Sequence, residues 1–218
     1  MTRNYFDKEL QDLQLDLVKM SSVVEEALLN SIKALKHQDV ELARKVIEGD
    51  DVPDKMEFDI EDKCFKLIAL QQPMAKDLRQ IATALKIITD LERIADHAVD
   101  ISKITIKLSN EVYIKELIDI PRMGELASKM VKDCIDAFVH QDIEKAKEIS
   151  RMDDEVDALY SQIFRELLVI MMEDPKKITQ ATHFLFVSKY LERVADHVTN
   201  ICERIIYAVT SEHLNLNE

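Results

Sequence analysis

The feature that most constrains the fold of this chain is an internal repeat. Residues 90–97 read Asp-Leu-Glu-Arg-Ile-Ala-Asp-His, and residues 190–197 read Tyr-Leu-Glu-Arg-Val-Ala-Asp-His. Seven of the eight positions are identical or exchange Ile for Val, and the likeness continues as far as Ile101 and Ile201. A match of this length between two parts of one chain predicts that the same structural unit is built twice.

The composition favours helices for that unit. The 218 residues include two Gly, four Pro and no Trp, and 47% of them are hydrophobic. So few helix breakers among so many helix formers predict an all-α protein with long helices and short loops. The repeat divides the chain into two halves, which we place at residues 1–117 and 118–218.

Apolar residues recur at helical spacing through most of both halves. They predict helices over residues 6–36, 39–70, 78–108, 126–139, 142–172 and 178–209. Gly49 and Pro53 interrupt the second of these helices, so a kink or a local break is expected there. The predicted fold is therefore six long helices arranged as two tandem three-helix bundles.

Turn signals recur at matching positions in the two halves. The tripeptide His-Gln-Asp occurs at residues 37–39 and again at 140–142, and Asp39 is the expected N-cap of the helix that follows. Residues 118–124, which contain Pro121 and Gly124, concentrate turn-forming residues. They are predicted to mark the boundary between the halves.

Charge and cysteine usage narrow the class of protein. The net charge is −13 and no run of Lys or Arg occurs, which disfavours binding to nucleic acid. Cys64, Cys134 and Cys202 lack metal-type spacing and leave one thiol unpaired, as expected in a reducing compartment. The charged start does not resemble a signal peptide, and the longest apolar run, 167–172, is far too short to span a membrane. We therefore expect a cytoplasmic protein without direct membrane insertion.

Four pairs of acidic residues suggest the chemistry that the repeat supports. Each pair has the form acid-x-x-x-Asp, so that both carboxylates project from the same side of a helix. The pairs are Asp50/Asp54, Glu92/Asp96, Asp153/Asp157 and Glu192/Asp196. Asp100 and Asn200 extend the second and fourth pairs by one further helical turn.

The two pairs of each half are expected to meet. In the first half, Asp54 lies 19 residues before Pro73 and Glu92 lies 19 residues after it. The corresponding distances in the second half, measured from Pro175, are 18 and 17 residues. Both arms of an antiparallel helical hairpin rise by about 1.5 Å per residue, so equal distance from the turn means equal height. On a helical wheel these acids begin at the edge of the apolar face and wind towards solvent.

Two interpretations of the acids compete. The plainer one is a solvated charged face, which explains most acidic helix surfaces. However, like charges four residues apart repel by roughly 0.2–0.5 kcal/mol per pair, and Arg93 and Arg193 would offset only part of this repulsion. A hard cation would offset all of it, since carboxylate and amide oxygens suit magnesium, manganese, iron or calcium. Because acid pairs occur at equal distances from the turn in both halves, we favour the interpretation that they bind metal ions. His97 and His197 project away from the acids and are predicted to be surface residues.

Several further stretches accompany the two copies of Leu-Glu-Arg-x-Ala-Asp-His. They are Phe-Asp-Lys-Glu-Leu at 6–10, Asp-Val-Glu-Leu-Ala at 39–43 and Gln-Pro-Met-Ala-Lys-Asp-Leu-Arg at 72–79. Together they resemble the PhoU family of accessory regulators of high-affinity phosphate transport, over nearly the whole chain. The resemblance implies two three-helix bundles related by a pseudo-twofold repeat. It also implies that the acid pairs bind metal ions in multinuclear sites, with iron, zinc, manganese or magnesium as the metal.

The resemblance further implies a non-enzymatic negative regulator, which restrains phosphate uptake and keeps phosphate-starvation signalling off when phosphate is plentiful. The implied partners are the ATPase subunit of the phosphate ABC transporter and a membrane-bound sensor histidine kinase. Through them the protein would be peripheral to the inner membrane. The family and the long amphipathic helices together predict a homodimer.

Two departures from the internal symmetry bear on the predicted sites. Pro53 stands within the first acid pair, where the second half has Val156, so the first site is expected to be distorted. Asn200 replaces Asp100, which makes the second site one negative charge poorer.

The sequence leaves two other functions open. A carboxylate-bridged di-metal enzyme of the ferritin-like type would need Glu-x-x-His pairs on core-facing helices, but none of the six histidines follows a Glu by three residues. A metal-free helical adaptor would keep all its acids solvated. Oxidase or phosphatase activity would identify the enzyme, whereas thermal stability indifferent to chelator and metal would identify the adaptor.

Overall fold

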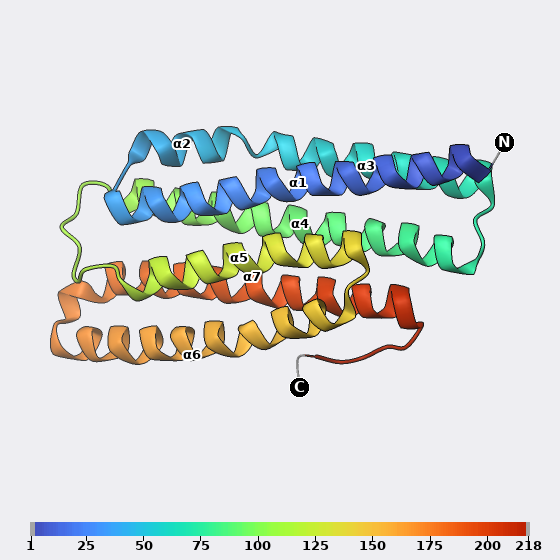
Figure 1. The fold of residues 1–218 in the computed structure, drawn as a ribbon. Helices are drawn as coiled ribbons and strands as arrows, with labels where there is room; N and C mark the ends of the chain where they lie inside the picture. Colours follow the sequence, from blue (N-terminus) through green and yellow to red (C-terminus); the bar gives the residue numbers. More distant parts are fainter. Residues whose placement is uncertain (1–2, 217–218) are drawn as a thin grey trace.

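The computed structural model describes residues 3–216, and the regular structure in that range is entirely helical. The elements are α1 (Arg3–His37), α2 (Val40–Glu48), α3 (Asp51–Gln71), α4 (Ala75–Leu108), α5 (Asp119–His140), α6 (Ile143–Glu173), a short 3-10 helix η1 (Pro175–Lys177) and α7 (Ile178–Thr210). Figure 1 shows α1–α4 as one bundle and α5–α7 as the other, with all helices running along a common direction. With α2 and α3 together forming the second span, the predicted all-α fold of two tandem three-helix bundles is confirmed.

The break between α2 and α3 follows from Pro53. A proline has no N–H to donate to the carbonyl four residues before it, which here belongs to Gly49. The N–H of Val52 donates to that carbonyl instead, at 3.1 Å. The corresponding residue of the second half is Val156, and α6 continues through it without interruption. The predicted break is confirmed.

The turns that precede α2 and α6 are built in the same way. Gln38 and Gln141 adopt left-handed backbone conformations, with φ values of 52° and 54°. The Asp that follows each glutamine caps the next helix by accepting a hydrogen bond from the backbone N–H three residues further on, at 3.0 Å in both halves. The N-cap role predicted for Asp39 is therefore confirmed, and Asp142 repeats it.

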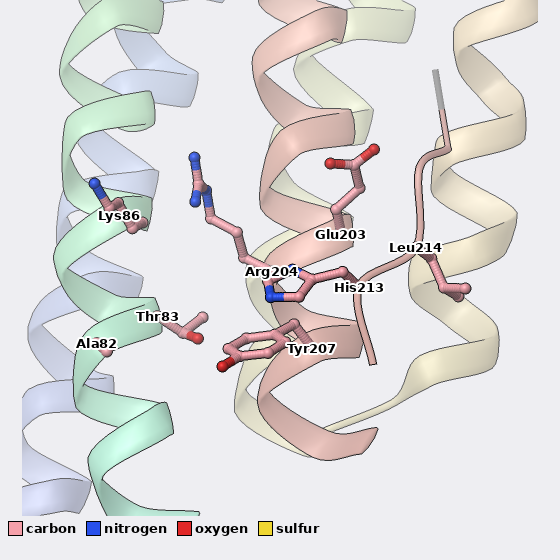
Figure 2. Close-up of a pocket in the computed structure, with 8 residues that line it drawn as sticks. All are labelled: Ala82, Thr83, Lys86, Glu203, Arg204, Tyr207, His213 and Leu214. Carbon is pink, nitrogen blue, oxygen red and sulfur yellow. The ribbon is translucent and has the colours of Figure 1, made fainter. Parts of the chain in front are cut away.

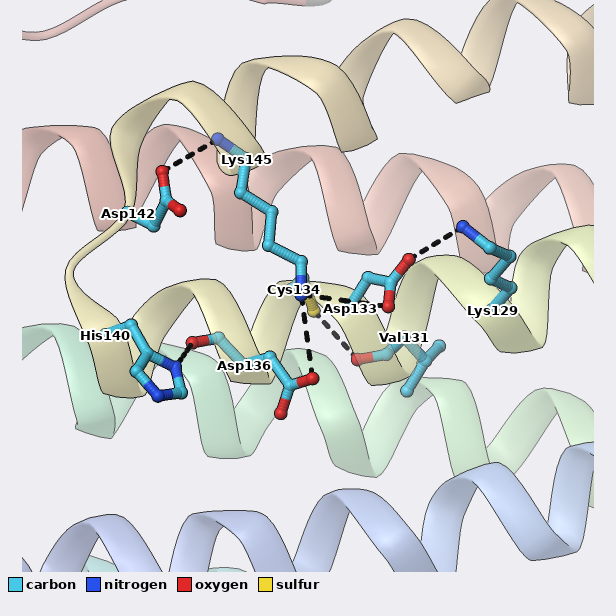
Figure 3. Close-up of polar contacts among 8 residues, drawn as sticks. All are labelled: Lys129, Val131, Asp133, Cys134, Asp136, His140, Asp142 and Lys145. Carbon is cyan, nitrogen blue, oxygen red and sulfur yellow. Dashed lines mark hydrogen bonds and ion pairs between the residues drawn. The ribbon is translucent and has the colours of Figure 1, made fainter.

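Surface ion pairs also connect α6 to α5 beside the second of these turns (Figure 3). Lys145 Nζ lies 3.9 Å from a carboxylate oxygen of Asp133 and 3.6 Å from one of Asp136. Asp133 pairs in addition with Lys129, at 2.8 Å. Exposed pairs of this kind contribute about 0–1 kcal/mol each. The N-cap and the apolar contacts therefore do more than these ion pairs to fix the turn.

One continuous hydrophobic core joins both halves. At its centre α4 and α7 run antiparallel and pack against each other, while α4 also contacts α1–α3 and α7 also contacts α5 and α6 (Figure 1). Fully buried side chains such as Leu17 and Phe184 come from both repeats. The three cysteines are buried and free. Among residues 3–216, no helix is long and apolar enough to cross a membrane.

The second half begins earlier than its periodicity predicts. The helix expected over 126–139 starts at Asp119, so that Pro121 and Gly124 lie inside α5 and not in a linker. Pro121 falls in the first turn, where a helical N–H has no partner and a proline is tolerated. Residues 109–118 form the actual connection between the halves.

Gly124 has a packing role that yields a test of this interface. A Cβ atom added there would lie 2.6 Å from Cγ1 of Ile32 on α1. Helix propensity alone would make Gly124→Ala stabilising by about 0.5–1 kcal/mol. Because α1 leaves no room for the methyl group, we expect the substitution to lower the free energy of unfolding by about 1–3 kcal/mol. Urea denaturation measures the change, and a stabilised variant would contradict the close approach of α5 to α1.

Candidate metal sites

The first acid cluster forms where α3 and α4 pack side by side. Burial, and after it the charges of Asp54 and Asp96, raises the pKa of Asp50. Burial is again the largest cause for Glu92, whose pKa is raised further by Asp96 and less strongly by Asp54. The four carboxyl groups, those of Asp50 at the N-cap of α3, Asp54 in α3, and Glu92 and Asp96 in α4, therefore lie within electrostatic reach of one another. This is the convergence expected from their equal distances to the turn.

The second cluster forms in the same way between α6 and α7. Burial and the charges of Asp157, Asp196 and Glu192 raise the pKa of Asp153 to about 7. The pKa values of Asp157 and Asp196 are also raised, by burial first and by Glu192 second. Four carboxyl groups again converge, and burial together with their mutual repulsion raises the pKa of three of them, that of Asp153 most.

The side chains on α4 wind outwards as the helical wheel predicts. Glu92 is 18% exposed, whereas Asp96 is 39% and Asp100 is 40% exposed. On α7 the corresponding Glu192 is 14% exposed. Each cluster therefore has a sheltered inner end against the neighbouring helix and an outer end open to solvent.

Three carboxylate oxygens in the clusters are buried without a hydrogen-bond partner. They are Oδ1 of Asp50, Oδ1 of Asp153 and Oε2 of Glu192. Asp50 and Asp153 occupy corresponding positions in the two repeats. A buried acceptor without a donor costs about 1–3 kcal/mol, and more when it is charged. The same unpartnered oxygen therefore recurs at corresponding positions of the two repeats.

Neighbouring cations pair with Glu92 and Asp96 in the first cluster and with the other oxygen of Glu192 in the second. Arg93 lies 3.3 Å from Glu92 and 3.1 Å from Asp96, and Lys189 lies 2.6 Å from Glu192. Across residues 3–216, no three His, Cys, Asp or Glu side chains are arranged as a ready ligand set for a metal ion. Some of the carboxylate oxygens that could bind a metal are therefore engaged in ion pairs with Arg93 and Lys189.

Sequence reasoning missed two participants in the clusters. Glu57 adds its charge to that of the first cluster, where it raises the pKa of Glu92. Lys189 pairs with Glu192 in the second cluster, where the sequence predicts that Arg193 offsets the repulsion between the acids. Both could have been found, because Glu57 follows Asp54 by three residues and Lys189 precedes Glu192 by three. This spacing places two side chains on the same side of a helix.

The two outermost predicted ligands, Asp100 and Asn200, follow the inner acids by one helical turn. Asp100 pairs with Lys103 at 3.2 Å, and its charge acts on His97 and Tyr190 at the contact between the repeats. Asn200 is partly buried on α7, one helical turn beyond the inner acids. Electrostatic contacts therefore link eight of the ten predicted ligands into two groups of four, whereas Asp100 pairs with Lys103 and acts on residues at the contact between the repeats.

The prediction that His97 is a surface residue is wrong. His97 is only 9% exposed, and its ring stacks on that of Tyr190 with 5.4 Å between the centroids. Burial, helped by the nearby His197 and Arg193, lowers its pKa to about 4. The physical reason is that the face of α4 turned away from the first bundle is the face that packs on α7. His197 is partly exposed, with 25% of its side chain accessible.

The repeated motif itself forms this contact between the halves. His197 Nδ1 lies 3.0 Å from one carboxylate oxygen of Asp90, and Arg204 Nε lies 3.5 Å from the other. Asp90 is only 8% exposed. Tyr190, its counterpart in the second copy, stacks on His97 of the first. The one position at which the two copies differ chemically is thus occupied in each by a residue that contacts the other copy's histidine.

The fold and the two clusters define an all-α protein made of a tandem repeat, with one polycarboxylate cluster in each repeat. The PhoU domain model matches the chain twice, over residues 17–105 and 120–205. The chain belongs to the PhoU family, as the sequence resemblance predicted.

Relatives match over nearly their full length. A phosphate-specific transport system accessory protein PhoU homolog from Clostridium acetobutylicum is 46% identical over 219 residues, which cover 100% of both chains. A PhoU homolog from Aquifex aeolicus is 43% identical and covers 85% of this chain and 84% of its own. The crystal structure of PhoU from Pseudomonas aeruginosa matches with a TM-score of 0.91 and 35% identity, covering 95% of this chain and 100% of that one. PhoU from Streptococcus pneumoniae, described as a phosphate transport system regulatory protein, matches with a TM-score of 0.90, 31% identity and coverage of 96% and 99%.

Proposed function

We propose that this chain is a non-enzymatic accessory protein of a phosphate-specific transport system, and that it restrains phosphate uptake and phosphate-starvation signalling. The observation that carries the proposal is full-length similarity to relatives named as accessory proteins of such systems. The name of the Streptococcus pneumoniae relative, a regulatory protein, supports the regulatory role.

The proposed partners come from the family relationship. They are the ATPase subunit of the phosphate transporter, a sensor histidine kinase and a second copy of the chain. Binding to the first two would hold the protein at the cytoplasmic face of the inner membrane. The role is tested by phosphate uptake in cells that lack the chain, which should exceed uptake in cells that express it. Equal uptake in both would overturn the negative role.

We also propose that each half binds a metal cluster. The ligands of the first are Asp50, Asp54, Glu92, Asp96 and Asp100, and those of the second are Asp153, Asp157, Glu192, Asp196 and Asn200. The donor set supports this, because carboxylate and amide oxygens are what hard cations prefer. Iron, zinc, manganese and magnesium are the metals to be tested. The buried oxygens without partners on Asp50 and Asp153 support it further.

A bound cation would supply positive charge at the point where the acids repel one another. Its ligands would bridge α3 to α4 in the first half and α6 to α7 in the second. Arg93 and Lys189 would give up their present ion pairs as the carboxylates turn to the metal. The role of the metal in this proposal is to fix the surface that the bundles present to partners.

Metal analysis of paired variants tests the two-cluster proposal. We expect Asp54→Ala with Asp96→Ala, and separately Asp157→Ala with Asp196→Ala, each to remove about half of the bound metal, because each disables one ligand set. Elemental mass spectrometry on protein purified without an affinity tag or chelator measures the content.

A matched control removes two charges outside the clusters. Asp59 and Glu61 are exposed residues of α3, so Asp59→Ala with Glu61→Ala should leave the metal content unchanged. If the wild-type protein stays empty after exposure to iron, zinc, manganese and magnesium, the acids are a charged surface. The regulatory proposal would then rest on family membership alone.

A further inference from the structure

A cavity of about 290 Å³ lies between α4, α7 and the segment that follows α7 (Figure 2). Its lining includes Thr83 and Lys86 from α4, Arg204 and Tyr207 from α7, and His213 and Leu214 from the C-terminal segment. None of these residues belongs to either acid cluster. The volume is at the lower end of the range for small-molecule sites.

The C-terminal segment is held in place as one wall of this cavity. The ring of His213 stacks on Tyr207, with 4.2 Å between centroids and 18° between planes. The backbone N–H of Leu216 donates a hydrogen bond to Glu203 Oε1 at 2.8 Å. Figure 2 shows the Glu203 carboxylate beside this segment and turned away from the gap between α4 and α7. Glu203, the one acid in the lining, is therefore hydrogen-bonded to the C-terminal segment.

Two cations enter the cavity from facing helices. Figure 2 shows the guanidinium of Arg204 in the gap between α4 and α7, whereas the side chain of Lys86 lies over α4 at a similar height. No ion pair of Lys86 occurs within residues 3–216. Arg204 Nε lies 3.5 Å from Oδ2 of Asp90, and neither of these two atoms has a hydrogen-bond partner. Most of the donor capacity of the two cations is therefore available to a ligand.

Hydroxyl groups and apolar surface complete the lining. Thr83 and Tyr207 contribute hydroxyl groups below the two cations (Figure 2). The rings of Tyr207 and His213 and the side chain of Leu214 form the apolar part. A ligand that fits must therefore carry an anionic group with several acceptor oxygens next to a small apolar or planar part.

The internal repeat supplies an independent argument. Positions 83, 86, 204 and 207 correspond to 183, 186, 104 and 107 at the other end of the α4–α7 contact. In place of Lys86 and Arg204 that end has Phe186 and Ile104. The helix packing is thus compatible with apolar residues at both positions, so packing alone does not account for the cations.

We propose that this cavity binds a small organic phosphate monoester. Its phosphoryl group would bind Arg204 in the gap, and the exposed side chain of Lys86 would turn towards it, so that an ammonium and a planar guanidinium both donate charge-assisted hydrogen bonds to its oxygens. Its organic part would rest against Tyr207 and Leu214. A phosphoryl group is favoured over a carboxylate because three terminal oxygens and a charge approaching −2 match two cations and two hydroxyls better than two oxygens and a single charge do.

Calorimetric titration with phenyl phosphate tests the proposal. The full chain is first stripped of metal with a chelator and dialysed, so that no metal at the acid clusters can recruit phosphate. Lys86→Ala is expected to weaken binding about tenfold, as for the loss of a charged hydrogen bond. Lys107→Ala removes the same charge from an exposed site on the same helix and should change affinity by less than about twofold, because solvent and salt screen it. Phenol, which lacks the anion, should not bind.

Three results would overturn the proposal. The first is no binding of phenyl phosphate to the wild-type chain at millimolar concentration. The second is an equal loss of affinity in the two lysine variants, which would indicate attraction by overall charge and not by this cavity. The third is binding of phenol as tight as that of phenyl phosphate. Lys86 is exposed, so neither folding nor core packing depends on it.

Discussion

Asp153→Asn is expected to stabilise the metal-free protein above pH 7 and to remove the second cluster's share of the stabilisation that metal gives the wild-type chain. Burial and four neighbouring carboxylates raise the pKa of Asp153 to about 7, whereas an unfolded aspartate titrates near pH 3.9. The folded state thus holds this proton more tightly than the unfolded state does. Stability consequently falls as the pH rises from about 4 to about 7, and it stays reduced above that range.

The neutral asparagine avoids this penalty. Because the site is partly open to solvent, we expect a gain of about 1–2 kcal/mol, less than the full shift would give. With metal present the wild-type protein should be the more stable of the two, since the variant has lost a charged ligand. The measurement is thermal unfolding of both proteins at pH 8, each with chelator and with added manganese.

Glu173→Gln is the control, because Glu173 is an exposed acid near the far end of α6. It should change stability little under either condition. A variant at position 153 that is less stable than wild type in chelator would contradict the raised pKa. Equal stabilisation of both proteins by manganese would contradict a ligand role for Asp153.

The convergence of the acids could be predicted because two simple rules determine it. Helical periodicity places Glu92 and Asp96 on one side of α4, and equal distance from Pro73 brings them level with Asp54. The same reasoning holds in the second half. It depends only on contacts within one hairpin, which the sequence specifies locally.

The contact between the repeats could not be predicted in this way. The helical wheel of α4 shows which face meets its own bundle but not whether a second bundle covers the opposite face. For that reason His97 was assigned to the surface, although it is buried against Tyr190. The cavity beside Lys86 and Arg204 was missed for a related reason. It depends on residues 211–216, which lack any periodic pattern and fold back onto α7 through His213.

The same contact supplies the second large prediction, that Asp90→Ala lowers the free energy of unfolding by about 2–3 kcal/mol. Asp90 is buried and is the partner of both His197 and Arg204. Removing one member of a buried ion pair costs about 3–5 kcal/mol, because the remaining charge loses its compensation. Arg204 is 39% exposed, so water recovers part of that loss and the lower figure is expected.

Denaturant unfolding of Asp90→Ala, His197→Ala and the double variant measures the interaction energy between these two side chains, apart from their other contacts. If the hydrogen bond of 3.0 Å joins the halves, the double variant should be more stable than the sum of the two single effects predicts. Tyr190→Phe is the matched control at the corresponding position, because it keeps the ring that stacks on His97. Additive effects of Asp90→Ala and His197→Ala would contradict the contact. Since α4 and α7 belong to one core, the loss should appear in the unfolding of the whole chain and not in one half alone.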